Sequence, residues 1–236
     1  MLRDLTVTGR KGFRIASQII TDRSPGTVLF PEYNGLYELI TREVEGLTDA
    51  QLDFSSAQWA WAAWSIRRQL SHMAFATYWW LVVRWGATLF PDGNHGIDDV
   101  QDLTVSDFDR RLDERRYWDL PILLEKLRAG ITLIQRVLAE RSVGFLRSQT
   151  YLLEVRHEFR PIWRLLIQAH PTGITVTADG SKLSMTLEAM LRHLYFEETT
   201  HLYNIQRLKR AQGLSTIADV PRVGYWVLDG WDRSEP

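Results

Sequence analysis

The chain has 236 residues, of which 45% are hydrophobic and 24% are charged, and its formal net charge is -1. This composition is typical of a globular protein with a substantial core, and the near-neutral charge predicts neither a nucleic-acid partner nor attraction to an anionic membrane. The chain contains no cysteine, which excludes disulfides, thiolate metal ligands and a cysteine nucleophile.

Turn-forming residues at 24–26 indicate that residues 1–30 form an N-terminal lead-in with at most one short helix. The opening sequence MLRDLTVTGRKGF lacks the apolar run of a signal peptide, so we expect a cytoplasmic protein. The first clear amphipathic pattern predicts a helix over 31–46, with Pro31 in its first turn and Gly46 at its end.

Ser65 is suited to cap a second long helix, predicted over 65–88. Residues 69–83 within it carry no charge. This apolar run is too short to span a membrane and contains a histidine, so it predicts a buried helix.

The polar segment 92–117 predicts a long crossover rather than a core element. It is followed by a third helix over 119–141, which has a proline in its first turn. Residues 142–172 are expected to carry a further helix, broken by Pro161.

Residues 174–186 alternate between apolar and polar side chains, and the pair Asp179-Gly180 in their middle is a strong hairpin signal. We expect this hairpin to be the only regular β structure. Thr186 then caps a last long helix, predicted over 186–212.

Four amphipathic helices with one long crossover predict an all-α fold, a four-helix bundle over residues 31–213. The tail, residues 214–236, contains two tryptophans that we expect to dock it onto the bundle. The helix predicted over 65–88 carries three tryptophans that cannot all point inward, so we expect an exposed apolar face and a homodimer; they are Trp79, Trp80 and Trp85.

The last helix carries the most informative pattern of the chain. Its core-facing stripe has steps of three and four, and two of its seven positions are polar: Leu187, Met190, Leu194, Glu197, His201, Ile205 and Leu208. Glu197 and His201 lie one turn apart, about 6 Å along the axis. Burying them without partners costs several kcal/mol, so a divalent metal is an economical explanation. A plain Glu–His ion pair is the alternative.

A catalytic zinc site needs a third protein ligand. His72 is a candidate because it lies within an apolar run, where an imidazole must find a partner. His193 lies about 80° around the helix from the second histidine of the pair, which places it in a supporting position. His95 and His170 are expected at the surface, and His157 lacks the second histidine of an HExxH helix.

The segments WSIRRQLSHM and TLEAMLRHLYFEETTHLYNIQRLKR resemble the DinB-like superfamily, and most closely its branches related to mycothiol-dependent maleylpyruvate isomerase and small-thiol S-transferases. The resemblance spans residues 31–213 and rests on seven matching positions: Trp64, Ser65, Ile66, His72, His193, Glu197 and His201. It implies a four-helix bundle in which His72, Glu197 and His201 hold a divalent metal, commonly zinc, nickel or iron. The glycine-containing continuation of close relatives, HxGH or HRGQ, is absent after His201, so no particular thiol is implied.

A site of two histidines and one glutamate leaves a coordination position for water or a substrate thiolate, whose pKa the metal lowers. We therefore expect transfer, isomerisation or hydrolysis on a small electrophilic molecule, with a low-molecular-weight thiol as a possible co-substrate. Gln69, Asn204 and His193 are candidates for supporting the ligands. The alternative is a non-catalytic metal-containing bundle with a stress-related or binding role.

Overall fold

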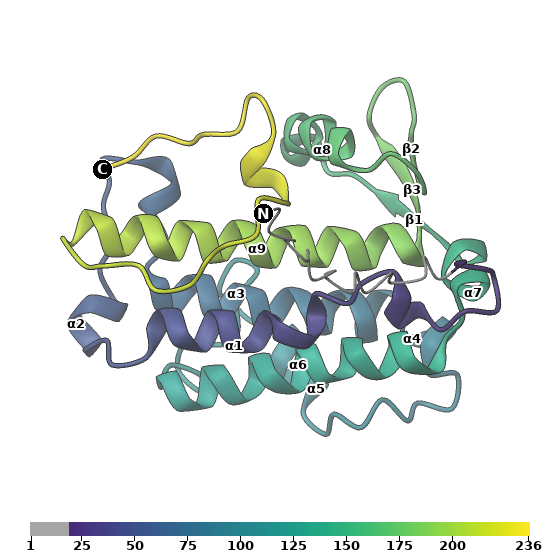
Figure 1. Ribbon diagram of the computed structural model, residues 1–236, viewed down its shortest axis with the longest axis horizontal. Helices are drawn as coiled ribbons and strands as arrows, with labels where there is room; N and C mark the ends of the chain where they lie inside the picture. Colours follow the sequence, from purple (N-terminus) through teal and green to yellow (C-terminus); the bar gives the residue numbers. More distant parts are fainter. Residues whose placement is uncertain (1–18) are drawn as a thin grey trace, which may run out of the picture.

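The computed structural model describes residues 19–236. These residues form a mainly helical protein with a small three-stranded sheet at one end (Figure 1), which confirms the predicted predominance of helix. Most of the lead-in predicted for residues 1–30 lies outside the described residues, and its described end contains a 3₁₀ turn at Gly26–Val28. Within 19–236, none of the helices has both the length and the apolar character required to cross a membrane.

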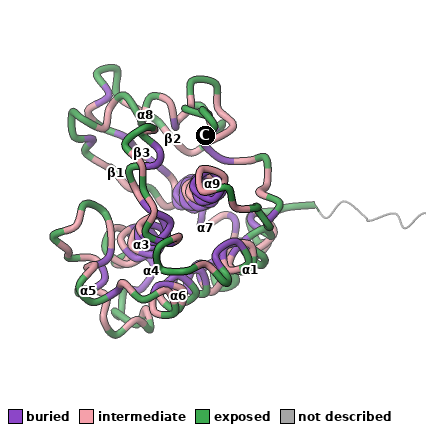
Figure 2. The backbone as a smooth tube through the Cα atoms, turned by 90° about the vertical axis from the view of Figure 1, so that its left-hand side faces the viewer, coloured by how far each residue is buried: buried purple, intermediate pink, exposed green. Residues whose placement is uncertain are grey.

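The four longest helices occupy the positions that the sequence predicted: α1 (Tyr33–Val44), α3 (Ile66–Tyr78), α6 (Leu120–Glu140) and α9 (Leu187–Ala211). Helix α3 packs against both α6 and α9, and α1 also packs against both. Figure 2 shows these four helices grouped together, each with buried residues along its length. Shorter elements connect them: α2 (Asp49–Leu52), α4 (Gly86–Leu89), α5 (Val100–Thr104), α7 (Val143–Ser148), α8 (Arg160–Leu166), and 3₁₀ turns at Ala60–Ala62, His157–Phe159, Ile167–Ala169 and Tyr225–Val227.

Local capping explains why these helices begin and end where the sequence predicted. The hydroxyl of Ser65 accepts a hydrogen bond from the Arg68 amide at the start of α3, and Thr186 does the same for Ala189 in α9. Gly213 follows α9 with φ at +72°, the left-handed conformation that commonly ends a helix. These caps are confirmed.

The helix predicted over 65–88 is not regular throughout. After α3, residues Trp79–Arg84 form a π-helical turn, in which the Trp85 amide donates to the Trp80 carbonyl at 3.0 Å. Trp80 and Trp85 are both buried, and Trp79 is half-buried. The expectation that these tryptophans leave an apolar face exposed is therefore wrong, because the wider turn and the neighbouring elements cover them. The homodimer remains a prediction.

The sheet has the strand order β1-β3-β2, and both pairings are antiparallel. Its strands are β1 (Thr150–Glu154), β2 (Ile174–Val176) and β3 (Lys182–Thr186). The hairpin predicted around Asp179-Gly180 is confirmed as β2 and β3. The prediction that it is the only β structure is wrong, because residues 150–154 pair along the other edge of β3.

The segment 142–172, expected to be one helix broken by Pro161, contains α7, β1 and α8 instead. Pro161 lies in the first turn of α8, where a missing amide hydrogen costs nothing. The proline therefore starts a helix here. The segment covers one side of α9 rather than extending a long helix (Figure 1).

The tail, residues 214–236, runs back along α9. Trp226 stacks on Tyr203 of α9, with ring centroids 4.5 Å apart. The guanidinium of Arg207, which is fully buried, donates to the carbonyls of Asp232 and Ser234. These contacts hold the tail against the helix.

Glu43 fixes the start of the tail from inside the core. Its carboxylate is fully buried, lies 2.6 Å from the Lys209 ammonium, and accepts from the amides of Ile217 and Ala218. Glu43 thereby joins α1, α9 and the tail through one buried charged group.

We predict that Glu43→Ala lowers the free energy of unfolding by about 3–5 kcal/mol, because it leaves the Lys209 ammonium buried without a counter-charge. Urea unfolding followed by tryptophan fluorescence measures this loss. Glu45→Ala, at an exposed position two residues further on, is the matched control and should change stability by less than about 0.5 kcal/mol. Equal losses in both variants would contradict the assigned role of Glu43.

Candidate metal centre

The structure brings His72 of α3 together with Glu197 and His201 of α9. One ligand atom from each residue lies within 4.8 Å of the other two. The Glu197 Oε2 atom is 3.4 Å from His201 Nε2 and 3.8 Å from His72 Nε2. The histidine side chains are 9% and 12% exposed, whereas that of Glu197 is 24% exposed, so the carboxylate is the most accessible of the three.

Hydrogen bonds on the far side of each ring assign the tautomers of the two histidines. His72 Nδ1 lies 2.6 Å from the carbonyl oxygen of Arg110, which can only accept, so this nitrogen carries the proton. His201 Nδ1 lies 2.5 Å from the side-chain oxygen of Gln69, whose amide nitrogen faces the Trp64 carbonyl. In the neutral form of each ring, Nε2 therefore carries the lone pair.

With both rings neutral, two imidazole lone pairs and one carboxylate oxygen converge with no hydrogen between them. Three such acceptors repel one another unless a proton or a metal ion lies among them. Two atoms that bind one zinc ion at 2.0–2.1 Å with a tetrahedral angle are about 3.4 Å apart, close to the distances of Glu197 Oε2 from the two rings. A charge-assisted hydrogen bond would be about 2.7–2.9 Å, so the separations fit shared metal ligation better than an ion pair.

The local electrostatics favour the ligand forms of these groups. Burial raises the pKa of Glu197, but the interaction of its carboxylate with His201 and His72, when these rings are protonated, more than offsets this and holds the pKa well below its usual range. Burial lowers the pKa of His201, although the neighbouring carboxylate opposes that shift. A deprotonated carboxylate and a neutral imidazole are the forms that bind a metal.

The loop that orients His72 has an unusual backbone. Arg110 is the one non-glycine residue with a positive φ, +49°, among the described residues. Its neighbour Leu112 donates its amide hydrogen to the Ser71 hydroxyl at 3.0 Å, so α3 holds this loop in place with two consecutive side chains. Strain of this kind persists only where the surroundings fix it, and it is concentrated at functional sites.

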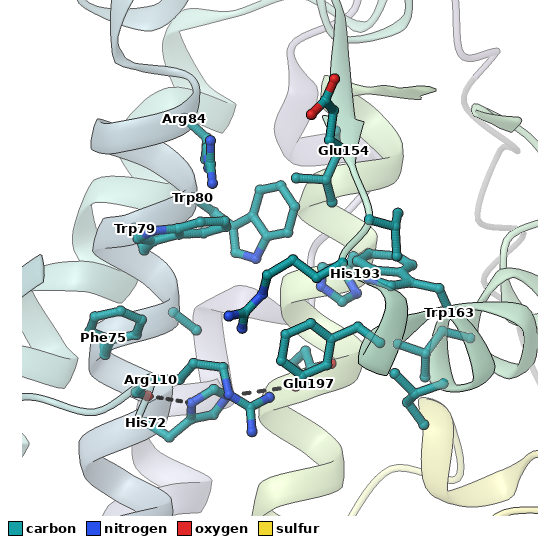
Figure 3. Close-up of a pocket in the computed structure, with 17 residues that line it drawn as sticks. His72, Phe75, Trp79, Trp80, Arg84, Arg110, Glu154, Trp163, His193 and Glu197 are labelled. Atoms are coloured by element: carbon teal, nitrogen blue, oxygen red, sulfur yellow. Dashed lines mark hydrogen bonds and ion pairs between the residues drawn. The ribbon is translucent and has the colours of Figure 1, made fainter. Parts of the chain in front are cut away.

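A cavity of about 430 Å³ opens onto the cluster through His72 and Glu197 (Figure 3). Its walls are mainly aromatic and aliphatic, with arginines among them. Its lining includes Phe75, Trp79, Trp80, Arg84, Arg110, Phe159, Trp163 and His193. The volume falls in the range of small-molecule sites.

His193 lies in the wall of this cavity rather than among the three convergent ligand atoms. Its Nδ1 atom is hydrogen-bonded to the hydroxyl of Tyr225, which also lies 2.8 Å from His170 Nε2. The prediction that His170 is a surface residue is wrong. It is 6% exposed, because the tail residue Tyr225 packs over it.

Of the two other residues predicted to support the ligands, Gln69 contacts His201 directly. Asn204 lies in a separate hydrogen-bond network, where its side-chain oxygen accepts from Arg207 at 3.2 Å. His95 is half-buried beside Phe90 and joins no group of ligands within residues 19–236. The sequence did not predict three residues of this region, because the elements that carry them have no periodic pattern. They are Arg84 in the π turn, Arg110 in a loop and Tyr225 in the tail.

Comparisons of the chain with protein-family models, curated proteins and solved structures found no match. The resemblance to DinB-like proteins therefore rests on the sequence motifs alone. The geometry of the site is independent of that resemblance.

Burial, together with the nearby His193 and Arg192, lowers the pKa of His170 to about 3. In the unfolded chain this imidazole has a pKa of about 6.5, so the unfolded state binds more protons between the two values, and stability falls as pH falls through that window. We predict that His170→Gln flattens the decrease in unfolding free energy between pH 6.5 and 4, although the variant is less stable at neutral pH. His157→Gln, at an exposed position, is the control for urea titrations across this range. An unchanged slope in His170→Gln would contradict the assignment.

Proposed function

We propose that this protein is a DinB-like metal-binding protein in which α1, α3, α6 and α9 form the four-helix bundle. His72, Glu197 and His201 hold one divalent cation, for which the donor set suits zinc, with nickel or iron as alternatives. The observation that carries the proposal is the convergence of two imidazole Nε2 atoms and a carboxylate oxygen beside a cavity.

Each ligand has a partner that fixes it in this role. The Arg110 carbonyl and the Gln69 amide oxygen accept the Nδ1 protons and orient the two rings, an arrangement that raises the basicity of the ligating nitrogen. Trp64 packs against both histidines, and its ring centroid lies 5.1 Å from that of His72 and 6.2 Å from that of His201. The tryptophan covers part of both rings, while Glu197 borders the cavity.

Among the described residues, three potential ligands converge here. A structural zinc site is usually closed by four protein ligands, whereas a catalytic site keeps one position open. The adjacent cavity supports the catalytic alternative over a purely structural metal. When bound, the ion would lower the pKa of a water molecule or a small thiol toward neutrality and so supply a nucleophile.

The proposed activity is therefore transfer, isomerisation or hydrolysis on a small electrophile. The chain contributes binding and orientation through the cavity walls. His193, held by the Tyr225 hydroxyl, lines the same cavity and is placed to exchange a proton with a bound molecule. Reaction of small thiols with 1-chloro-2,4-dinitrobenzene, and hydrolysis of 4-nitrophenyl acetate, test the two main classes. The metal-loaded protein should accelerate one of them, and the His72→Ala variant should not.

We predict that His72→Ala, Glu197→Ala and His201→Ala each abolish stoichiometric metal binding, because each removes one of three ligands. Elemental analysis and zinc titration measure this loss. His193→Ala should weaken binding only in part, and His157→Ala should leave it unchanged. If His193→Ala abolishes binding while Glu197→Ala does not, the ligand set is wrong.

We further predict that Gln69→Leu weakens metal affinity by about 10- to 100-fold, because His201 loses the acceptor that fixes its tautomer. Competition with a zinc indicator measures the affinity. Gln168→Leu is the matched control, since Gln168 is exposed and its amide nitrogen bonds only to the Arg164 carbonyl. An affinity of Gln69→Leu equal to that of the control would show that the hydrogen bond has no part in metal binding.

A further inference from the structure

Arg84 lies at the end of the cavity opposite His72 (Figure 3). Its guanidinium stacks on Trp79, 4.1 Å from the ring centroid, and its Nη1 atom donates to the Tyr151 hydroxyl at 3.0 Å. The Nε atom is buried and has no hydrogen-bond partner in the described part of the chain. One edge of this cation is therefore unsatisfied.

Arg84 also forms no ion pair with any carboxylate of residues 19–236. The other two cavity arginines have acidic partners, since Arg110 pairs with Asp109 at 3.1 Å and Arg156 with Glu158 at 3.3 Å. Glu154 also borders the cavity, but it is exposed and its carboxylate points away from the aromatic walls (Figure 3).

An unpaired guanidinium beside an apolar cavity favours an anionic ligand, because the low dielectric strengthens a charge-assisted hydrogen bond. Because Nε is enclosed by protein atoms, a carboxylate in the cavity would accept from the terminal Nη2 group, which has no hydrogen bond with the described residues. Between Arg84 and the metal ligands the walls are aromatic, contributed mainly by Phe75, Trp79, Trp80, Phe159 and Trp163. Such walls favour a flat apolar body.

We propose that the cavity binds a small aromatic carboxylate, with its anionic group on Arg84 and its other end toward His72 and Glu197. This proposal rests on the proposed function only for the end of the ligand that would lie near the metal and react. Binding of the carboxylate at Arg84 does not need the metal.

The test compares 2-naphthoate with 2-naphthamide, a neutral molecule of almost the same shape, by isothermal titration calorimetry on the full chain. The wild-type protein should bind the carboxylate about ten- to a hundredfold more tightly, as expected for a hydrogen bond to a charged group. Arg84→Gln should remove this preference. Arg164→Gln, which removes the same charge from an exposed position on α8 outside the cavity, should keep it.

Two further samples separate this inference from the proposed metal site. Wild-type protein treated with a chelator should keep the preference for the carboxylate. If chelation removes it while Arg84→Gln does not, the carboxylate binds the metal, and the inference is overturned while the metal site is supported. Equal binding of the two probes, or binding of neither, also overturns it. Arg84→Met, which also removes the charge, decides the matter if Arg84→Gln does not fold, because an undiminished preference there would exclude a role for this side chain.

Discussion

The structure depends on one constraint, the burial of two imidazoles and a carboxylate between α3 and α9. Each of these groups loses its hydration when the helices pack, and each must recover a partner. The constraint extends well beyond the three residues. It fixes the side chain of Gln69 and holds the carbonyl of Arg110 against His72. Arg110 has a positive φ, which a non-glycine residue rarely adopts. A loop far from α9 in the sequence is thus positioned by the chemistry of a helix–helix interface.

Helix α9 organises the rest of the molecule in the same way. It is buried around most of its circumference, and its polar residues are bonded to different neighbours along its length. Near its start Glu188 bonds Arg147, His193 then reaches Tyr225, and toward its end Arg207 and Lys209 bind the tail and Glu43. A buried polar network destabilises the fold when some of its groups lack hydrogen-bond partners, and it specifies one packing arrangement when all of them have partners. The tail and the 142–172 segment therefore belong to the environment of α9.

The sequence predicts those features that depend on local interactions. The ends of α3 and α9 follow from caps at Ser65 and Thr186, and the β2–β3 turn follows from Asp179-Gly180, all within four residues of the backbone that they control. The approach of His72 to the α9 pair was predicted from the resemblance together with the polar residues in apolar stripes. The features that were missed are non-local. Residues 150–154 become a strand only because β3 offers an edge, and His170 is buried only because a residue 55 positions away packs on it.

The π turn explains how one helix reaches both ends of the cavity. Arg84 follows His72 by twelve residues, which in a regular α-helix would place it about 120° around the axis. The π turn takes up one extra residue, so the effective spacing is eleven and the offset falls to about 20°. Arg84 is thereby returned to the face that carries His72, with Trp79 between them on the same side. The irregular turn costs helical hydrogen-bond geometry, but it aligns the Arg84 guanidinium, the Trp79 ring and the candidate ligand His72 along one cavity. A regular helix of the same sequence would turn the guanidinium away from that cavity.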